Sequence, residues 1–91
     1  MKSILQSEKE CYITGAKEGL HLHHIYGASN RKASDKNGFV IWLRSDWHNM
    51  SEYGIHFDKE FDLKIKMECQ ARYEETHTRK EFISLIGRSY L

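Results

Sequence analysis

The sequence predicts an α+β domain in which a two-stranded antiparallel ribbon is covered by helices. Apolar and polar side chains alternate over residues 20–26, and a run of apolar β-branched and aromatic residues fills 39–43. A helical period of apolar residues begins at Phe57 and meets no glycine or proline up to about Glu75. The 91 residues, 40% hydrophobic and 30% charged, predict one globular domain spanning 1–91.

The segment before the first strand carries two local signals. Ser7 and Glu10 have the Ser-x-x-Glu spacing of a helix capping box, and residues 11–15 predict a short strand or a turn. The chain starts without an apolar signal core and has no apolar run of membrane-spanning length, so we expect an intracellular protein without a membrane partner. In that compartment Cys11 and Cys69 argue against a disulfide framework.

Two strands and the segment between them form the centre of the predicted domain. Because side chains alternate along a strand, the first strand places His21 and His23 on one face and His24 on the other. Residues 27–38 hold almost only turn-forming and charged residues, so we expect a long surface loop there. The apolar run 39–43 then forms the second strand.

Helices are predicted in the second half of the chain. Turn-forming residues dominate 45–56, which predicts a turn with one helical turn. The long helix over 57–75 has apolar rows on two faces and must therefore contact more than one neighbour. Either the final helix covers the second face, or this helix forms a homodimer interface. Thr78 and Glu81 form a second capping box, and Gly87 suits the end of the final helix.

The net charge of +1 conceals segregated blocks of charge. Residues 27–45 carry a net charge of +3, residues 46–62 carry −4, and residues 63–91 carry +2. The basic block consists of four cations against Asp35, namely Arg31, Lys32, Lys36 and Arg44. The near-neutral total is therefore weak evidence against a nucleic-acid partner.

The histidines are concentrated in one part of the chain, with five of the six between residues 21 and 56. Pairing of the strands as a hairpin would bring His23 next to His48, with His24 on the opposite side of the strand. Neutral imidazole binds metal ions and also exchanges protons near neutral pH, so the adjacent histidines suit different tasks. A lone histidine is more often an ordinary core or surface residue, and His21 and His77 are interpreted that way.

His56 needs a particular backbone path to join His48 at one ion. In an unbroken helix eight residues span about 12 Å, which is too far for both side chains to bind the same metal. Residues 49–55 must therefore form a loop if the two histidines share an ion, and Gly54 permits such a loop.

These residues carry a family resemblance. Residues 22–25 (Leu-His-His-Ile) and 43–48 (Leu-Arg-Ser-Asp-Trp-His) resemble segments of the HNH endonucleases, the ββα-metal or His-Me finger nucleases, particularly the short phage and prophage members. The resemblance is strong over residues 20–56, a little over a third of the chain, and looser in the flanks. It implies a ββα-metal core in which His24 is the general base. The family's metal ligands match His23, His48 and His56, which would hold one divalent ion, whether Mg, Mn, Zn or Ni.

One departure from the family concerns a structural zinc site. Many members carry two Cys-x-x-Cys pairs, but the matching positions here read Cys11 with Thr14 and Arg44 with Trp47. No four-thiolate zinc site can form from these residues. We expect Trp42, Trp47 and the aromatic residues of the long helix to hold the fold by packing instead.

A second departure concerns the family's middle asparagine. Its expected position is near Phe39, so the nearest substitute is Asn37, with Asn49 as another possibility. A nearby carbonyl or the side chain of Asn37, which is assigned to the catalytic group, is expected to fix the tautomer of His24, since the second nitrogen of a working imidazole needs a partner.

The resemblance implies hydrolysis of phosphodiester bonds in DNA, with double-stranded DNA favoured. Four basic residues are expected to contact the DNA backbone, which brings affinity without reading sequence: Arg31, Lys32, Lys36 and Arg44. Two other classes stay open. One is a non-catalytic nucleic-acid-binding module with a structural histidine-bound zinc, which lacks metal-dependent nicking. The other is a helical interaction protein with its interface over 57–75, which would dimerise tightly and hold no metal.

Overall fold

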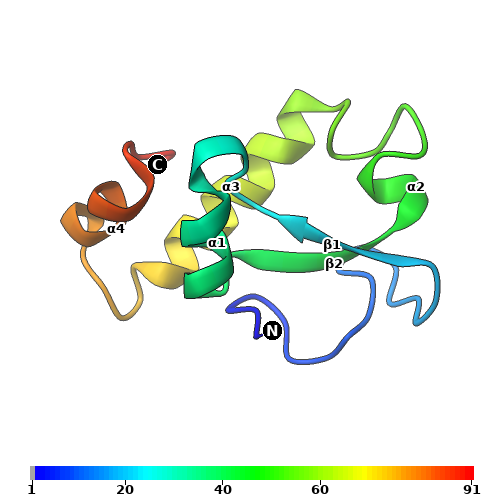
Figure 1. Ribbon diagram of the computed structural model, residues 1–91, viewed down its shortest axis with the longest axis horizontal. Coiled ribbons are helices and arrows are strands. Elements are labelled where there is room, and N and C mark those ends of the chain that lie inside the picture. Colours follow the sequence, from blue (N-terminus) through cyan, green and yellow to red (C-terminus); the bar gives the residue numbers. More distant parts are fainter. Residues whose placement is uncertain (1) are drawn as a thin grey trace.

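The fold consists of a short β-ribbon with helices on both of its faces (Figure 1). The computed structural model describes residues 2–91. In chain order the elements are β1 (Leu20–His24), the short 3-10 helix η1 (Ala28–Asn30), α1 (Arg31–Asn37), β2 (Val40–Arg44), α2 (Ser45–His48), α3 (Lys59–Tyr73) and α4 (Arg79–Ile86). β1 and β2 form one antiparallel sheet, so the predicted α+β class and two-stranded ribbon are confirmed. No helix within this described range is long and apolar enough to cross a membrane.

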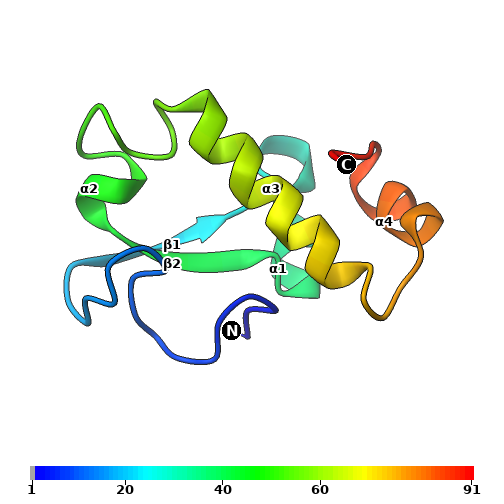
Figure 2. The ribbon, with the colours of Figure 1, turned by 180° about the vertical axis from the view of Figure 1, so that it is seen from behind.

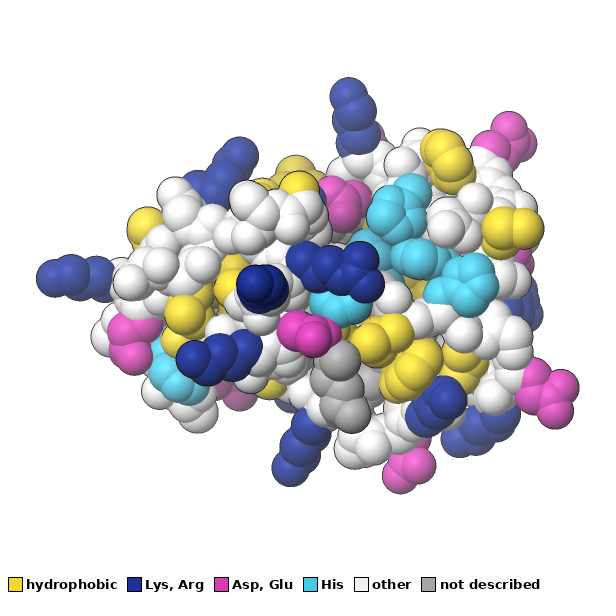
Figure 3. Space-filling view, viewed as in Figure 1, with side chains coloured by type: hydrophobic (Ala, Val, Ile, Leu, Met, Phe, Trp, Pro, Cys, Tyr) yellow, Lys and Arg dark blue, Asp and Glu magenta, His cyan; other side chains and the backbone are white. Residues whose placement is uncertain are grey.

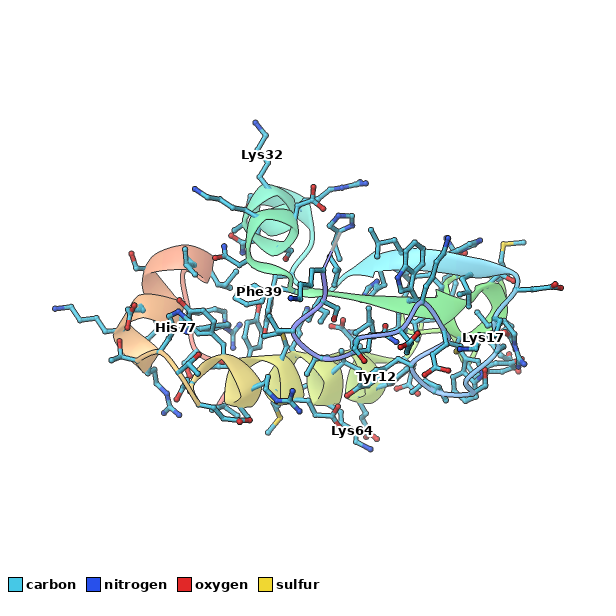
Figure 4. The ribbon with its side chains drawn as sticks, turned by 90° about the horizontal axis from the view of Figure 1, so that it is seen from below. Tyr12, Lys17, Lys32, Phe39, Lys64 and His77 are labelled. Carbon is cyan, nitrogen blue, oxygen red and sulfur yellow. The ribbon has the colours of Figure 1, made fainter. Side chains whose placement is uncertain are left out.

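The two faces of the ribbon have different partners. α1 and α3 lie on opposite sides of it, as the views from behind and from below show (Figures 2 and 4). β1 and β2 pair so that His21 lies opposite Leu43 and His23 opposite Ile41. Leu43 and Ile41 are both 0% exposed, so this face packs into the core together with residues of α3. His24 consequently projects from the other face, toward α1.

The prediction of a surface loop over 27–38 is wrong, because η1 and α1 occupy most of it. Buried Ser34 anchors α1, since its hydroxyl donates to the carbonyl of Tyr26 at 2.6 Å and accepts from the Tyr26 N–H at 3.2 Å. The helix ends at Gly38 with φ +74°, where a Cβ would collide with the carbonyl oxygen of Lys2. Ser34 is the one buried residue among the 7 of α1, so the sequence shows no apolar helical period there.

The N-terminal segment runs beside β2 without forming a helix. The capping-box spacing of Ser7 and Glu10 begins no helix. The side chain of Gln6 holds this segment in a non-helical conformation. Its Nε2 donates to the Glu10 carbonyl at 2.8 Å, and its Oε1 accepts from the Trp42 N–H at 2.6 Å. Residues 11–15 form a turn, which is one of the two predicted outcomes.

The two C-terminal helices begin and end where local signals place them. The helix predicted over 57–75 is α3, shortened by two residues at each end. Asp58 caps its start, since one carboxylate oxygen accepts from two backbone N–H groups, each at 3.1 Å. α4 begins with the predicted capping box of Thr78 and Glu81 and ends at Gly87, which has φ +101°.

Aromatic side chains join the ribbon to α3 and α4. The ring of Tyr26 lies 5.5 Å from that of Phe39 and 5.3 Å from that of Phe82. Phe39 in turn lies 5.4 Å from the ring of Tyr73 at the end of α3. These edge-to-face contacts bury Phe39 and Phe82 completely, and they fix the end of β1 against the helices.

Aromatic packing supports the segment around α2. The ring of Trp47 lies 4.9 Å from Tyr53 and 5.9 Å from Phe61, as expected for an aromatic support near α2. Cys11 and Cys69 are buried free thiols.

The second apolar row of α3 stays open to solvent in the monomer. Leu63 is 45% exposed and Met67 is 39% exposed. The alternative in which α4 covers this face is therefore wrong, and a homodimer through residues 57–75 stays a prediction.

Candidate metal centre

Three histidines from separate segments of the chain converge. One ring nitrogen from each of His23, His48 and His56 lies within 4.8 Å of the others, so the three could hold one metal ion. His23 comes from β1, His48 is the last residue of α2, and His56 lies in the connection to α3. The Nε2 atoms of His48 and His56 are 2.9 Å apart. The three predicted ligands are therefore neighbours in space.

A tight loop returns His56 to His48. The backbone N–H of Ile55 donates to the carbonyl of Trp47 at 2.8 Å, and the N–H of His56 donates to the carbonyl of His48 at 3.1 Å. Gly54 lies so close to this backbone that a Cβ would sit 2.7 Å from the His48 carbonyl oxygen. The loop expected through residues 49–55 is confirmed, and the lack of a side chain at position 54 permits it.

Burial keeps the imidazoles of His23 and His48 neutral. His23 is 5% exposed, and its Nε2 is buried without a hydrogen-bond partner. Burial lowers the pKa of His23 from 6.5 to about 3, with smaller contributions from His48 and His56. Burial likewise lowers the pKa of His48 to about 4, followed by the influence of His56 and His21. Near pH 7 both rings are neutral, which is the form that binds a metal. The unpartnered His23 nitrogen therefore fits a metal ligand.

His24 projects from the opposite face of β1 and pairs with an acid. Its Nε2 lies 2.7 Å from Oδ1 of Asp35, which comes from α1. The His24 side chain is 14% exposed and that of Asp35 is 48% exposed. Asp35 is absent from the predicted site, because a loop over 27–38 gives no reason to aim one side chain at His24. The helical geometry of α1 supplies that reason.

The contacts of the two candidate asparagines differ from those predicted. The side-chain amide of Asn37 donates to the carbonyl of Ala33 at 2.8 Å, within α1. Asn49 is exposed and follows the end of α2. Within residues 2–91 the side chain that hydrogen-bonds His24 is Asp35, so Asn37 does not set the tautomer of His24 as expected.

A cleft joins the two sides of the site. His23, His24 and His56 all line a cleft of about 410 Å³, together with Lys59 and Lys66 of α3. The view of Figure 3 shows histidine side chains gathered beside those of lysine and arginine on one face. The two lysines are absent from the predicted site, although their seven-residue spacing places them on the same side of a helix.

The four residues that are predicted to contact the DNA backbone lie on two separate parts of the fold. Arg31, Lys32 and Lys36 are exposed on α1, and Lys32 extends away from the ribbon (Figure 4). Arg44 lies at the far end of β2, and its guanidinium donates to both carboxylate oxygens of Asp46, at 2.6 and 2.8 Å. The basic surface of α1 is therefore separate from the paired guanidinium of Arg44.

The two histidines interpreted as ordinary residues have different surroundings. The ring of His77 stacks on Tyr73 with 4.0 Å between centroids, as befits a satisfied surface residue. His21 instead contacts the cluster, because its Nδ1 lies 3.0 Å from Nδ1 of His48. It therefore adjoins the cluster, although it lies outside the three histidines that could hold one ion. The same alternation that pairs His21 with His23 on one strand face is the signal that could have found it.

Comparisons with known protein families, curated proteins and solved structures return no match to this chain. The chemistry of the site is therefore the basis for a functional proposal. It combines three converging imidazoles, a histidine–carboxylate pair and lysines around one cleft.

Proposed function

We propose that this protein is a metal-dependent endonuclease of the HNH, or ββα-metal, type that hydrolyses phosphodiester bonds in DNA. The observation that carries the proposal is that two adjacent residues of β1 face opposite sides of the strand. His23 faces a cluster with His48 and His56, whereas the next residue, His24, faces Asp35 and opens to the same cleft. The resemblance of residues 20–56 to the HNH family supports the same reading.

The histidine cluster fits a single divalent ion. His23, His48 and His56 would hold it, and an all-imidazole set favours Zn, Ni or Mn over Mg, which prefers oxygen ligands. When bound, such an ion supplies a Lewis acid for the scissile phosphate and the leaving oxygen. His56 is exposed, so the cluster is open to the cleft on that side.

His24 would act as the general base. Its Nε2 is engaged by Asp35, so a neutral His24 carries its proton on Nε2 and leaves Nδ1 to accept a proton from water. The Asp35 carboxylate holds this tautomer and stabilises the imidazolium that forms. Asp35 therefore takes the orienting role for which Asn37 was expected.

Positive charge around the cleft suits a polyanionic substrate. Lys59 and Lys66 line the cleft, where Asp62 pairs with Lys66 at 2.7 Å, and exposed Arg31, Lys32 and Lys36 extend the positive charge over α1. Contacts of this kind position a phosphate backbone without reading its sequence. Double-stranded DNA is the favoured substrate.

Nicking of supercoiled plasmid tests the proposal. The protein loaded with Mn²⁺, Ni²⁺ or Zn²⁺ should nick plasmid, and EDTA should stop it. His24→Ala should lower the rate by roughly 10²- to 10⁴-fold while the metal stoichiometry stays unchanged. His77→Ala, which removes a stacked surface histidine, is the matched control and should nick at the wild-type rate. A His24→Ala protein as active as wild type would remove His24 as the base. A metal-loaded wild-type protein that binds DNA without nicking would instead favour the non-catalytic module.

A further inference from the structure

Both ring nitrogens of His48 have a histidine partner. Its Nε2 lies 2.9 Å from Nε2 of His56, whereas its Nδ1 lies 3.0 Å from Nδ1 of His21. The rings of His21 and His48 meet edge to face, with 5.1 Å between centroids and an angle of 87°. His21 therefore contacts His48 on the edge of the ring that points away from His56.

Tautomer chemistry gives this contact a direction. A neutral imidazole carries one proton, so a His48 ring that offers its Nε2 lone pair to a metal carries the proton on Nδ1. That N–H needs an acceptor, and Nδ1 of His21 is at hydrogen-bonding distance. His21 can accept only if its own proton is on Nε2. One contact thus selects the tautomers of both rings.

The backbone holds His21 in place for this role. Its position in β1 opposite Leu43, which is fully buried, fixes the strand on which it stands. The two nitrogens of one imidazole point in different directions, so a residue that contacts Nδ1 of His48 is poorly placed to share an ion at Nε2. His21 is accordingly outside the group of three histidines that could hold one ion.

We propose that His21 is a positioning residue for the metal centre. It accepts a hydrogen bond from Nδ1–H of His48 and so leaves Nε2 of His48, which lies 2.9 Å from Nε2 of His56, to bind the ion. The inference rests on the metal centre of the proposed function and adds a fourth histidine to it. Partners of this kind orient metal-binding imidazoles and raise their basicity, and their loss typically weakens metal affinity by about 10- to 100-fold.

Two substitutions of similar shape separate the hydrogen bond from mere packing. His21→Asn keeps an acceptor oxygen at the δ position, whereas His21→Leu keeps the branched shape and removes the acceptor. Zn²⁺ affinity, measured in competition with a chromophoric chelator, should fall about 10- to 100-fold in His21→Leu. His21→Asn should recover most of that loss. Thermal unfolding of the metal-free variants checks that both fold.

Imidazole nitrogen spectra of the wild-type protein supply a readout that needs no variant. Long-range ¹H–¹⁵N correlations in the Zn²⁺-loaded protein should show the proton of His48 on Nδ1 and that of His21 on Nε2. A His48 ring protonated on Nε2, or His21→Leu and His21→Asn proteins with wild-type affinity, would overturn the proposal. Equal weakening in both variants would also overturn it, because an acceptor would then not matter.

The same measurements distinguish this inference from the nuclease proposal. A wild-type protein that binds one Zn²⁺ but nicks no plasmid with Mg²⁺, Mn²⁺, Ni²⁺ or Zn²⁺ contradicts the nuclease. The role of His21 is then supported or refuted by the affinity measurements alone. A wild-type protein that binds no Zn²⁺ overturns the metal centre and, with it, the role of His21.

Discussion

Nε2 of His24, the last residue of β1, lies 2.7 Å from Oδ1 of Asp35 in α1. Asp35→Asn keeps the size of the side chain but removes the charge that stabilises an imidazolium. We expect nicking to slow by roughly 10²- to 10⁴-fold, because a misoriented base loses most of its contribution. Single-turnover plasmid nicking measures the effect. Metal affinity should not change, since Asp35 lies outside the histidine cluster. A nicking rate equal to that of the wild type would show that Asp35 does not assist His24.

The three clustered histidines should differ from the base in what their loss does. His23→Ala and His48→Ala each remove an imidazole from a group that could hold one ion, so both should abolish stoichiometric metal binding. Calorimetric titration with Zn²⁺ measures stoichiometry and affinity together. His77→Ala serves as the control because its ring stacks on Tyr73 away from the cluster. Wild-type stoichiometry in both cluster variants would show that the ion binds elsewhere.

Gly54 should be intolerant of even one extra carbon. A Cβ there would lie 2.7 Å from the carbonyl oxygen of His48, so Gly54→Ala must push the returning loop away from α2. We expect a loss of about 1–3 kcal/mol in stability, typical of an overpacked site, together with weaker metal binding. Chemical denaturation and Zn²⁺ titration check the two effects. Gly27→Ala is the matched control because a Cβ at Gly27 meets no atom within 4 Å.

The exposed cations of α1 should set the salt dependence of DNA binding. Lys32→Ala and Lys36→Ala should each reduce the slope of log affinity against log salt by about 0.9 if each contacts one phosphate. Fluorescence anisotropy with a short duplex at several salt concentrations measures the slope. Lys80→Ala, an exposed change on α4, should leave it unaltered. Identical slopes in all three variants would place the DNA on another surface.

Acid should remove one stabilising contact near α2. Hydrogen bonds from Arg44, followed by that from Tyr53, lower the pKa of the Asp46 carboxyl below its ordinary 3.8. A carboxyl whose pKa falls on folding stabilises the protein above its unfolded-state pKa and loses that effect as the pH drops toward its folded-state value. Asp46→Asn should therefore lower the midpoint of thermal unfolding at pH 7. The difference from wild type should shrink steadily below about pH 4. A difference that is the same at pH 7 and pH 2 would contradict this assignment.

Elements with strong local signals could be predicted from the sequence. The alternation around His23, the apolar run of β2 and the capping box at Thr78 each specify structure within a few residues, and the ribbon and α4 follow them closely. α1 could not be predicted that way. Its anchor is the hydrogen bonding of Ser34 to Tyr26, a contact that exists only after folding.

The candidate site divides along the same line. The proximity of His23 and His48 could be predicted, because antiparallel pairing of β1 with β2 brings the residues that follow β2 next to β1. Asp35 could not be predicted without α1, and a single histidine such as His21 carries little information on its own. Asn37 was favoured by position in the sequence, whereas its amide is used within α1 itself.

The placement of α1 between the two strands also bears on how the chain assembles. β1 and β2 are separated by 15 residues, so their first hydrogen bonds close a sizeable connection and cost chain entropy before they return any energy. Formation of α1 shortens that connection and brings Ser34 into contact with Tyr26, near the start of the connection. Because α1 has only 7 residues and is anchored through Tyr26 at the end of β1, the helix and the ribbon are expected to form together. The histidine cluster, which needs both strands and the loop beyond them, is then among the last features to form.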